Sequence, residues 1–329
     1  MSEFDLIADY FTWDAPQTYS KQNNSNEVIK SVGDDAAVLS LAPHQQLVTS
    51  IDTLISGVHF PENTSAADIA YKALAVNLSD LAAMGAKPEW FTLALTVPNI
   101  QHDWLAEFSN SLKTLAKNVG IALVGGDTTK GHLSISIQVM GSVDSGKALF
   151  RDGASINDKI YVTGSLGDGV VGLLSRLNKL KLDNESANYC ETRLNRPTAR
   201  LNESELIKDL ASSCIDISDG LLQDLSHILK QSSLPNEQSK VGATLDLTQL
   251  PLSKALKAIN KKQAINYALS GGDDYELLFT IPEDNVEELI ERNRTHQYEF
   301  TCIGTITNKQ GIIDNNHNPL KTTGFDHFS

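Results

Sequence analysis

The pattern of hydrophobic and polar positions predicts a strand over residues 46 to 55, which read QLVTSIDTLI. Side chains alternate between the two faces of a strand, so Val48, Ser50 and Asp52 share one face. A hydroxyl and a carboxylate therefore point the same way from this strand.

Residues 66 to 85 form a helical pattern that is apolar nearly all round, which predicts a buried helix. Asn77 and Asp80 are three positions apart and share one face of it. A buried aspartate without a partner is costly, so we expect a metal ion or a hydrogen-bond cluster to compensate its charge.

A strand-helix-strand unit follows. It comprises the strand WFTLALTV at 90 to 97, a helix with an apolar stripe from Trp104 to Val119, a stop at Gly120, and the strand IALV at 121 to 124. Residues 132 to 143 alternate between apolar and polar and predict a half-buried strand. We therefore expect the first half to be a mixed sheet covered by helices.

The pattern restarts near Arg151 and again alternates strands with helices. The clearest strands are KIYVTG at 159 to 164 and YELLFTI at 275 to 281. Helices are expected near 168 to 180, near 200 to 211, and over 220 to 230, where Asp219 is a candidate cap. We expect two domains, 1–150 and 151–329, in an α/β (α+β) arrangement.

Composition supports a globular chain. The 329 residues are 41% hydrophobic and 21% charged, which excludes a disordered or fibrous class. The formal net charge of −14 repels nucleic acid and anionic membranes, so we expect neither as a partner.

The cysteines and the N-terminus indicate a cytoplasmic protein. Cys190, Cys214 and Cys302 form no CxxC pair, so neither a disulfide framework nor a zinc knuckle is expected. The start MSEFDLIADYF lacks the basic and apolar regions of a signal peptide, and polar residues interrupt the apolar stretch from Ile69 to Ala86.

Six segments place aspartate beside glycine, serine or threonine: GDDAA (33–37), SIDT (50–53), NLSD (77–80), GGDTT (125–129), DISDG (216–220) and GGDDYE (271–276). One such segment is usually a turn or a helix cap. Six together favour several magnesium sites beside phosphate, because aspartate oxygens suit Mg²⁺ and glycine lets the backbone approach a phosphate closely.

Three other signals are weaker. Residues 141 to 148 nearly form a P-loop, but Ala148 lacks the required hydroxyl, and a turn is favoured. Residues 167 to 172 read GDGVVG, yet no strand ending in an acid follows at the spacing of a dinucleotide fold. His59 follows the SIDT strand, where a surface group and a substrate contact are equally favoured.

The ordered motifs, with ALFRDGA, RPTAR and the terminal GFDHF, resemble the thiamine-monophosphate kinase family from Asp5 to Phe328. That family transfers the γ-phosphoryl group of ATP to thiamine monophosphate and makes thiamine diphosphate. It belongs to the superfamily of aminoimidazole-ribonucleotide synthetase, whose two-domain fold dimerises through the N-terminal domains. The resemblance therefore implies an N-terminal domain for metal, ATP and dimerisation, and a C-terminal domain that completes the site.

The resemblance also implies roles for individual residues. Magnesium positions are Asp35, Ser50, Ile51 (through its backbone), Asp52, Asp80, Asp127, Asp216 and Asp219. ATP contacts fall on Gly126, Asp127, Arg151 and Ser218. The thiamine side falls on His59, Asp273 and Phe325. No residue is expected to act as a covalent nucleophile.

Two positions depart from the family pattern. Asp273 stands where the family usually has glutamate, and Ala199 replaces the second proline of RPxPR. The first change affects a substrate contact, and the second affects a turn.

Physical chemistry agrees with this reading. Joining two phosphates requires two polyanions to approach each other. A pocket lined by carboxylates permits this only if bound metal ions make its net charge positive. The alternatives are a related ATP-dependent kinase or synthetase with another substrate, and a non-catalytic module that retains the nucleotide site. Selenophosphate synthetase is disfavoured because the first cysteine, Cys190, is far from the N-terminal motifs.

Overall fold

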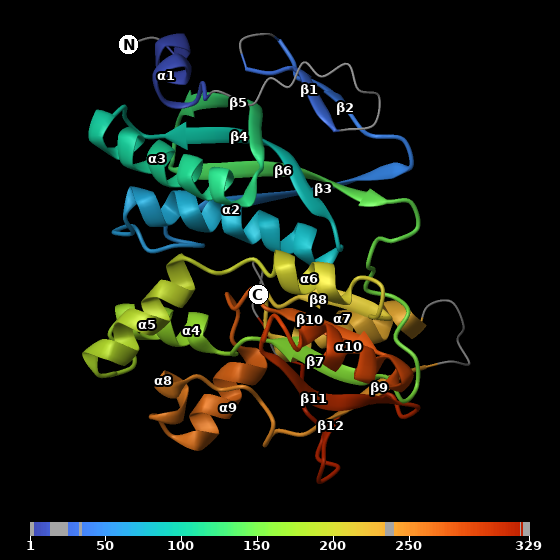
Figure 1. Cartoon of the computed structure of the whole chain (residues 1–329). Helices are drawn as coiled ribbons and strands as arrows, with labels where there is room; N and C mark the ends of the chain where they lie inside the picture. The colour runs from blue at the N-terminus through green and yellow to red at the C-terminus, as the bar shows by residue number, and fades with distance from the viewer. Residues whose placement is uncertain (1–2, 14–25, 33–34, 234–239, 323, 325–329) are drawn as a thin grey trace. The chain divides into compact units, whose positions relative to one another are not determined.

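A computed structural model of the chain describes residues 3–13, 26–32, 35–233, 240–322 and 324 (Figure 1). The chain folds into two compact units. Unit 1 comprises Met1–Leu81 and Ala86–Gly146, and unit 2 comprises Ala82–Gly85 and Lys147–Ser329. The main division follows Gly146, where the sequence analysis expects one after residue 150.

Unit 1 is built on a four-stranded sheet with the order β3-β6-β4-β5. Its strands are β3 (Gln45–Ile55), β4 (Lys87–Val97), β5 (Ala122–Lys130) and β6 (Ser134–Asp144). β6 pairs antiparallel with both β3 and β4, whereas β4 and β5 are parallel, so the sheet is mixed as expected. A separate two-stranded sheet joins β1 (Glu27–Lys30) to β2 (Val38–Ser40).

Helices α2 (Ala66–Ala83) and α3 (His102–Val119) lie side by side against the sheet of unit 1, and α1 (Glu3–Tyr10) precedes them (Figure 1). The apolar surface of α2 is buried, with Ala70 and Leu74 fully inaccessible. α3 ends at Gly120, whose left-handed φ of 82° lets its N–H reach Ala116 O. The buried helix and the glycine stop are therefore both confirmed.

Unit 2 is built on a six-stranded sheet with the order β12-β9-β11-β7-β10-β8. Its strands are β7 (Lys159–Thr163), β8 (Ser213–Asp216), β9 (Gly242–Leu245), β10 (Leu277–Ile281), β11 (Phe300–Thr307) and β12 (Gly311–Asp314). The pairs are antiparallel except β9 with β12, which is parallel. This second sheet is thus also mixed.

Alternate residues of β10 pack against helices on the two faces of this sheet. Leu278 joins a buried cluster that includes Leu225 of α7 (Leu221–Ser233). Phe279 joins a second cluster with Leu206 of α6 (Leu201–Ile207) and Leu289 of α10 (Val286–Asn293). The run LLFTI, apolar except for Thr280, therefore marks a strand buried on both sides.

The remaining helices of unit 2 are α4 (Asp168–Arg176), α5 (Asn184–Asn195), α8 (Lys254–Lys257) and α9 (Lys261–Ser270), with a 3₁₀ turn η1 (Glu283–Asn285). The helix expected near 168 to 180 ends earlier than predicted. Asn178 adopts a left-handed φ of 57°, which a continuing helix does not allow.

The glycines of residues 167 to 172 serve close packing. A Cβ added to Gly169 would lie 2.4 Å from Asp273 O, and one added to Gly172 would lie 2.3 Å from Cys190 O. The near match to a dinucleotide fingerprint therefore has a packing explanation.

Candidate active site

Side chains from β3 and α2 meet in a polar cluster within unit 1. Ser50 Oγ donates to Asp80 Oδ2 at 2.5 Å, and Asp52 N donates to Asn77 Oδ1 at 3.1 Å. The strand periodicity and the helical spacing predicted that these side chains share faces, and the fold turns those two faces toward each other.

The two carboxylates of this cluster lie close enough to influence each other. Burial, and then the charge of Asp80, raise the pKa of Asp52 to about 6. A cation between them would favour both ionised forms. The donors are hard oxygen atoms, which suit Mg²⁺.

Among the residues that the structure describes, no group of three or more His, Cys, Asp or Glu side chains is arranged to hold a metal ion by itself. Mg²⁺ is commonly held by one or two carboxylates, with waters and substrate phosphates as the other ligands. Asp52 and Asp80 with the hydroxyl of Ser50 fit that donor set.

Ile51 lies between the two polar residues of β3, and its side chain is 62% exposed on the opposite face of the strand. Its expected metal contact is through the backbone, so the outward side chain is compatible with that prediction.

A cavity of about 980 Å³ in unit 1 brings together Asp35, Gly126 and Asp127. Gly126 lies in the parallel pair β4–β5, where an added Cβ would approach Leu93 O to 2.0 Å. Glycine is therefore required at this point of the cavity wall, and backbone is left accessible there. The cavity unites two predicted metal positions with a predicted ATP position.

His59 is fixed by the loop after β3. Ile55 N donates to His59 Nδ1 at 3.0 Å, and Lys72 Nζ donates to His59 O at 3.2 Å. Because Nδ1 accepts a hydrogen bond, the proton of the neutral ring resides on Nε2. The side chain is thus set as an Nε2–H donor.

In unit 2 the DISDG and GGDDYE segments lie side by side. Asp273 N donates to Ser218 O at 2.9 Å, and Tyr275 N donates to Ile217 O at 2.8 Å. Asp216 is buried at the end of β8, opposite Leu277 of β10. These backbone bonds bring the predicted metal, ATP and substrate positions of this unit together.

Asp273 occupies an uncommon backbone conformation, with φ of 65°, and Tyr275 also has a positive φ of 51°. Tyr275 Oη donates to Asp273 Oδ1 at 3.1 Å and orients the carboxylate. Aspartate tolerates the left-handed region better than glutamate, so this backbone favours the residue present here.

Two buried acids of this loop, Asp274 and Glu276, connect it by hydrogen bonds to other parts of unit 2. Glu276 is fully inaccessible and accepts hydrogen bonds from Thr163, Arg193 and Arg200. Asp274 accepts from Gly167 N at 2.7 Å and from Gly169 N at 3.3 Å, which ties the loop to the start of α4. Burial raises the pKa of Asp274 well above its ordinary value.

The DISDG turn is held by an acid from α7. Asp224 accepts from the backbone of the turn, while Asp219 Oδ2 accepts from Gln223 Nε2 at 3.2 Å. Burial, and then the charge of Asp219, raise the pKa of Asp224 to about 7. The carboxylate seen to hold these amides is therefore Asp224, where the sequence analysis assigned the capping role to Asp219.

Two further predicted residues are placed less directly. Burial, and then the charge of Arg151, lower the pKa of His227, so Arg151 lies near α7. Gly324 packs against Asp219, because an added Cβ would lie 2.8 Å from Asp219 O. Phe325 follows it and lies outside the described residues.

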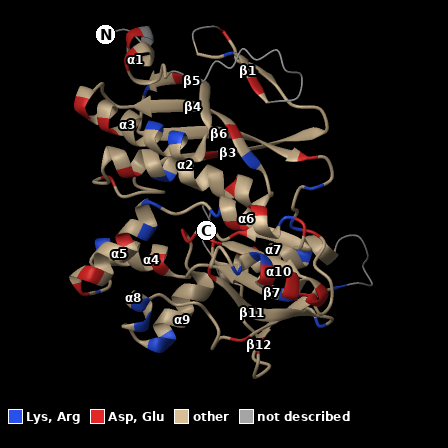
Figure 2. Ribbon diagram, viewed as in Figure 1, with Lys and Arg blue, Asp and Glu red and all other residues tan. Residues whose placement is uncertain are grey.

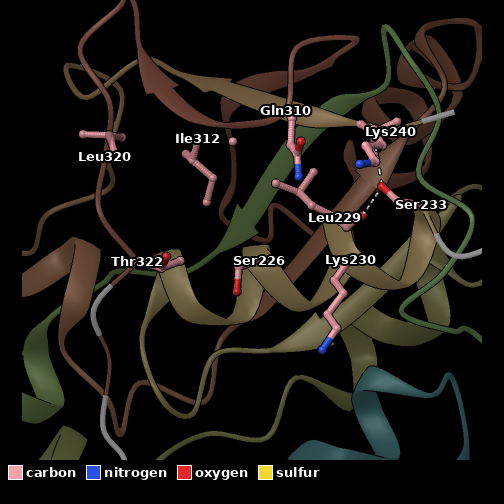
Figure 3. A pocket seen from close by; sticks show the side chains of 11 residues that line it. Ser226, Leu229, Lys230, Ser233, Lys240, Gln310, Ile312, Leu320 and Thr322 are labelled. Atoms are coloured by element: carbon pink, nitrogen blue, oxygen red, sulfur yellow. Dashed lines mark hydrogen bonds between the residues drawn. The ribbon is translucent and has the colours of Figure 1, made fainter. Parts of the chain in front are cut away.

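Unit 2 contains a cavity of about 500 Å³ beside α7 and β12 (Figure 3). Its described lining includes none of the predicted site residues. Ser233 Oγ donates to Leu229 O and accepts from Val241 N, and Lys230 points away from the other labelled side chains.

Charged residues of both signs occur on both units in the view of Figure 2. Within the part of the chain that the structure describes, no helix is long and apolar enough to span a membrane.

Comparison with known proteins decides the family. Residues 33–143 match the N-terminal domain of AIR synthase related protein, and residues 155–314 match its C-terminal domain. The chain is 44% identical to thiamine-monophosphate kinase of Escherichia coli (strain K12) over 333 aligned positions, covering 99% of this chain and 98% of that one. The chain belongs to the thiamine-monophosphate kinase family.

Solved structures of thiamine-monophosphate kinases agree with the fold. The crystal structure of the Stenotrophomonas maltophilia K279a enzyme has a TM-score of 0.84 and 40% identity, and the match covers 97% of this chain and 98% of that one. AaThiL complexed with AMPPCP and TMP has a TM-score of 0.76 and 30% identity, covering 91% and 92%. The expected two-domain AIR-synthase-like fold with mixed sheets is confirmed.

Asp224, Asp274 and Glu276 were not singled out by the sequence analysis. Asp274 and Glu276 lie within the GGDDYE segment, but only the fold shows that they are buried and which atoms they bind. A signal was present in Asp224, an acid on the apolar face of an amphipathic helix.

Proposed function

We propose that this chain is a kinase that uses ATP to phosphorylate thiamine monophosphate, and that it makes thiamine diphosphate and ADP. The observation that carries the proposal is 44% identity over nearly the full chain to a thiamine-monophosphate kinase. A relative of 30% identity was solved with AMPPCP and TMP, which supports the same pair of ligands for this chain.

The N-terminal unit supplies the principal cation site of this proposal. Asp52 and Asp80, with Ser50 and the backbone of Ile51, hold Mg²⁺ at the face where β3 meets α2. Asp35 and Asp127 hold a further cation at the cavity that they line. Bound Mg²⁺ supplies the positive charge that lets two phosphates approach each other.

The other predicted residues orient the two substrates. Gly126, Asp127, Arg151 and Ser218 contact ATP, and Asp216 and Asp219 bind further cations in unit 2. On the thiamine side, His59 donates from Nε2 and Asp273 accepts through its carboxylate, with Phe325 as the third contact. These roles rest on the resemblance and on the geometry described above.

The transfer is direct and in line. The acceptor is an ionised phosphate, so the reaction needs positioning and charge stabilisation and no protein nucleophile. Burial raises the pKa of Cys190 to about 12 and that of Cys214 above its ordinary value, so both thiols stay protonated at neutral pH. Inversion of configuration at a chiral γ-phosphate is expected, and net retention would indicate a phospho-enzyme.

A homodimer forms through the face of the unit 1 sheet that α2 and α3 leave uncovered. Leu47 and Ile51 of β3 are 50% and 62% exposed on this face. Thr49 lies between them, and two large apolar residues exposed on one sheet face are a candidate for a protein interface. A second copy of this chain is the occupant, as the resemblance implies.

The protein acts in the cytoplasm. Cys190, Cys214 and Cys302 are all free thiols, which suits a reducing compartment.

The alternative substrate assignment is another small phosphate acceptor within the superfamily. Initial rates with thiamine monophosphate and with a purine-precursor ribonucleotide, at equal ATP and Mg²⁺, separate the two. Preference for the ribonucleotide would reject thiamine monophosphate as the substrate.

A further inference from the structure

Asp224 holds three successive backbone amides with one oxygen atom. Its Oδ2 accepts from Ser218 N at 3.1 Å, from Asp219 N at 3.2 Å and from Gly220 N at 3.2 Å. The side chain is 3% exposed and comes from the first turn of α7. A carboxylate of the helix therefore folds back onto the turn that precedes it.

These hydrogen bonds change what the turn can bind. A helix N-terminus with uncommitted N–H groups is a ready anion site. Here the amides just before α7 already have Asp224 Oδ2 as their acceptor. Asp219 adds a second carboxylate at the same turn, so the local charge favours a cation over a bare phosphate.

The turn is fixed from its other side by the GGDDYE segment. Ser218 O accepts from Asp273 N at 2.9 Å. Gly272 packs so closely that an added Cβ would lie 2.6 Å from Ser218 O. With the three amides and Ser218 O committed, the half-buried side chains of Ser218 and Asp219 are the candidate ligand contacts at this turn, although Asp219 Oδ2 also accepts from Gln223 Nε2.

We propose that Asp224 is a positioning residue, which sets the 216–220 turn so that Ser218 and Asp219 meet the nucleotide and its cation. It makes this helix start bind phosphate through a cation instead of through its amides. The proposal rests on the proposed function and deepens it, because it names the group that controls the nucleotide side in unit 2.

Two substitutions separate hydrogen bonding from size. Asp224→Asn keeps one oxygen that can accept the three amides, and Asp224→Leu fills a similar volume with no acceptor. The Asn variant should stay within about threefold of wild-type kcat/KM for ATP, because a neutral acceptor is weaker but present. The Leu variant should raise the KM for ATP, and the Mg²⁺ concentration for half-maximal rate, by about tenfold or more. The KM for thiamine monophosphate should change much less.

A matched control removes a similar set of hydrogen bonds elsewhere. Asp314 is also buried, and its Oδ1 accepts from Asn316 N and Asn318 N, both at 2.8 Å, in the turn after β12. Asp314→Leu should lower the melting temperature while leaving both KM values at wild-type levels. A rise in the KM for ATP in this control as well would show that lost stability alone explains the effect.

A second readout does not depend on thiamine chemistry. The melting temperature should rise when ADP and Mg²⁺ are added to the wild type and the Asn variant, and rise far less in the Leu variant. If the wild type makes no thiamine diphosphate, the proposed function fails while this shift still tests Asp224. If Asp224→Leu does not fold, Asp224→Ala replaces it in the same comparison. A non-accepting variant with wild-type KM for ATP and a wild-type shift would overturn the proposal.

Discussion

Ser50 Oγ donates a hydrogen bond of 2.5 Å to Asp80 Oδ2 and joins β3 to α2. The helix contributes one carboxylate and the strand another, Asp52, whose pKa is raised by burial and by Asp80. Two acids held together in this way form a site whose charge needs a cation at neutral pH. We therefore expect Mg²⁺ to bind at this cluster of unit 1.

Asp80→Asn should lower kcat by about a hundredfold or more, because neutralising phosphate charge through a metal ion is worth several kcal/mol. Asp103→Asn is the charge-matched control, since Asp103 is exposed in the first turn of α3. The measurement is steady-state turnover across a Mg²⁺ series. Near-normal turnover of the Asp80 variant at limiting Mg²⁺ would contradict the metal role.

A thermal measurement tests the same cluster without turnover. Mg²⁺ should raise the melting temperature of the wild type and of Asp103→Asn, because it relieves repulsion between Asp52 and Asp80. The gain should be smaller in Asp80→Asn. An equal gain in melting temperature in all three proteins would contradict Mg²⁺ binding at this cluster.

Asp273→Asn should raise the KM for thiamine monophosphate by about tenfold or more and change the KM for ATP little, since a charged hydrogen bond contributes about 1.5 to 3 kcal/mol. Asparagine also tolerates the left-handed backbone at this position, so the variant isolates the charge. Tyr275→Phe is the companion variant. It removes only the hydroxyl that orients Asp273 and should have a smaller effect in the same direction. A rise confined to the KM for ATP would place Asp273 on the nucleotide side.

Glu276→Ala should lower the free energy of unfolding by about 3 to 5 kcal/mol, because it removes the buried carboxylate that binds both Arg193 and Arg200. Among the described residues, Arg193 then keeps only the more distant Asp168 as an ion-pair partner, at 3.9 Å, and Arg200 keeps only Glu203. The control is Glu288→Ala, which breaks an exposed i,i+4 pair with Arg292 in the same unit. That change should cost at most about 1 kcal/mol. Chemical denaturation measures the free energy of unfolding of both variants. Similar losses of stability would show that the buried ion pairs contribute no more than the exposed pair.

Leu47→Lys should raise the dimer dissociation constant by about tenfold or more, since it brings like charges together at the proposed sheet interface. Ile290→Lys is the control, because Ile290 is 61% exposed on α10 in unit 2. Light scattering after size-exclusion chromatography reports the mass of each variant. A wild-type monomer, or an equal effect of both changes, would reject this interface.

The sequence predicted the elements whose periodicity is strong. The strand containing Ser50 and the helix containing Asp80 were placed within a few residues of β3 and α2, because burial on one face or all round leaves a clear pattern. Their mutual approach was not predicted by the pattern. The pattern indicated only that Asp80, an acid on a buried helix, needs a compensating partner, and the family resemblance grouped it with Asp52.

The supporting residues were not predictable in the same way. Glu276 binds Arg193 and Arg200, which are 83 and 76 positions away, and no local pattern encodes such pairs. The polar helix α5, which carries Arg193, has too weak an apolar stripe to set its bounds from sequence. The left-handed backbone of Asp273 is likewise imposed by its surroundings, since aspartate alone does not require it.

The most direct test of the account is product analysis after incubating the purified chain with ATP, Mg²⁺ and thiamine monophosphate. Anion-exchange chromatography with ³¹P NMR identifies and counts the products. We expect thiamine diphosphate and ADP in equal amounts, formed only when all three components are present. Consumption of ATP that leaves thiamine monophosphate unchanged, or that requires a different acceptor, would contradict the central claim.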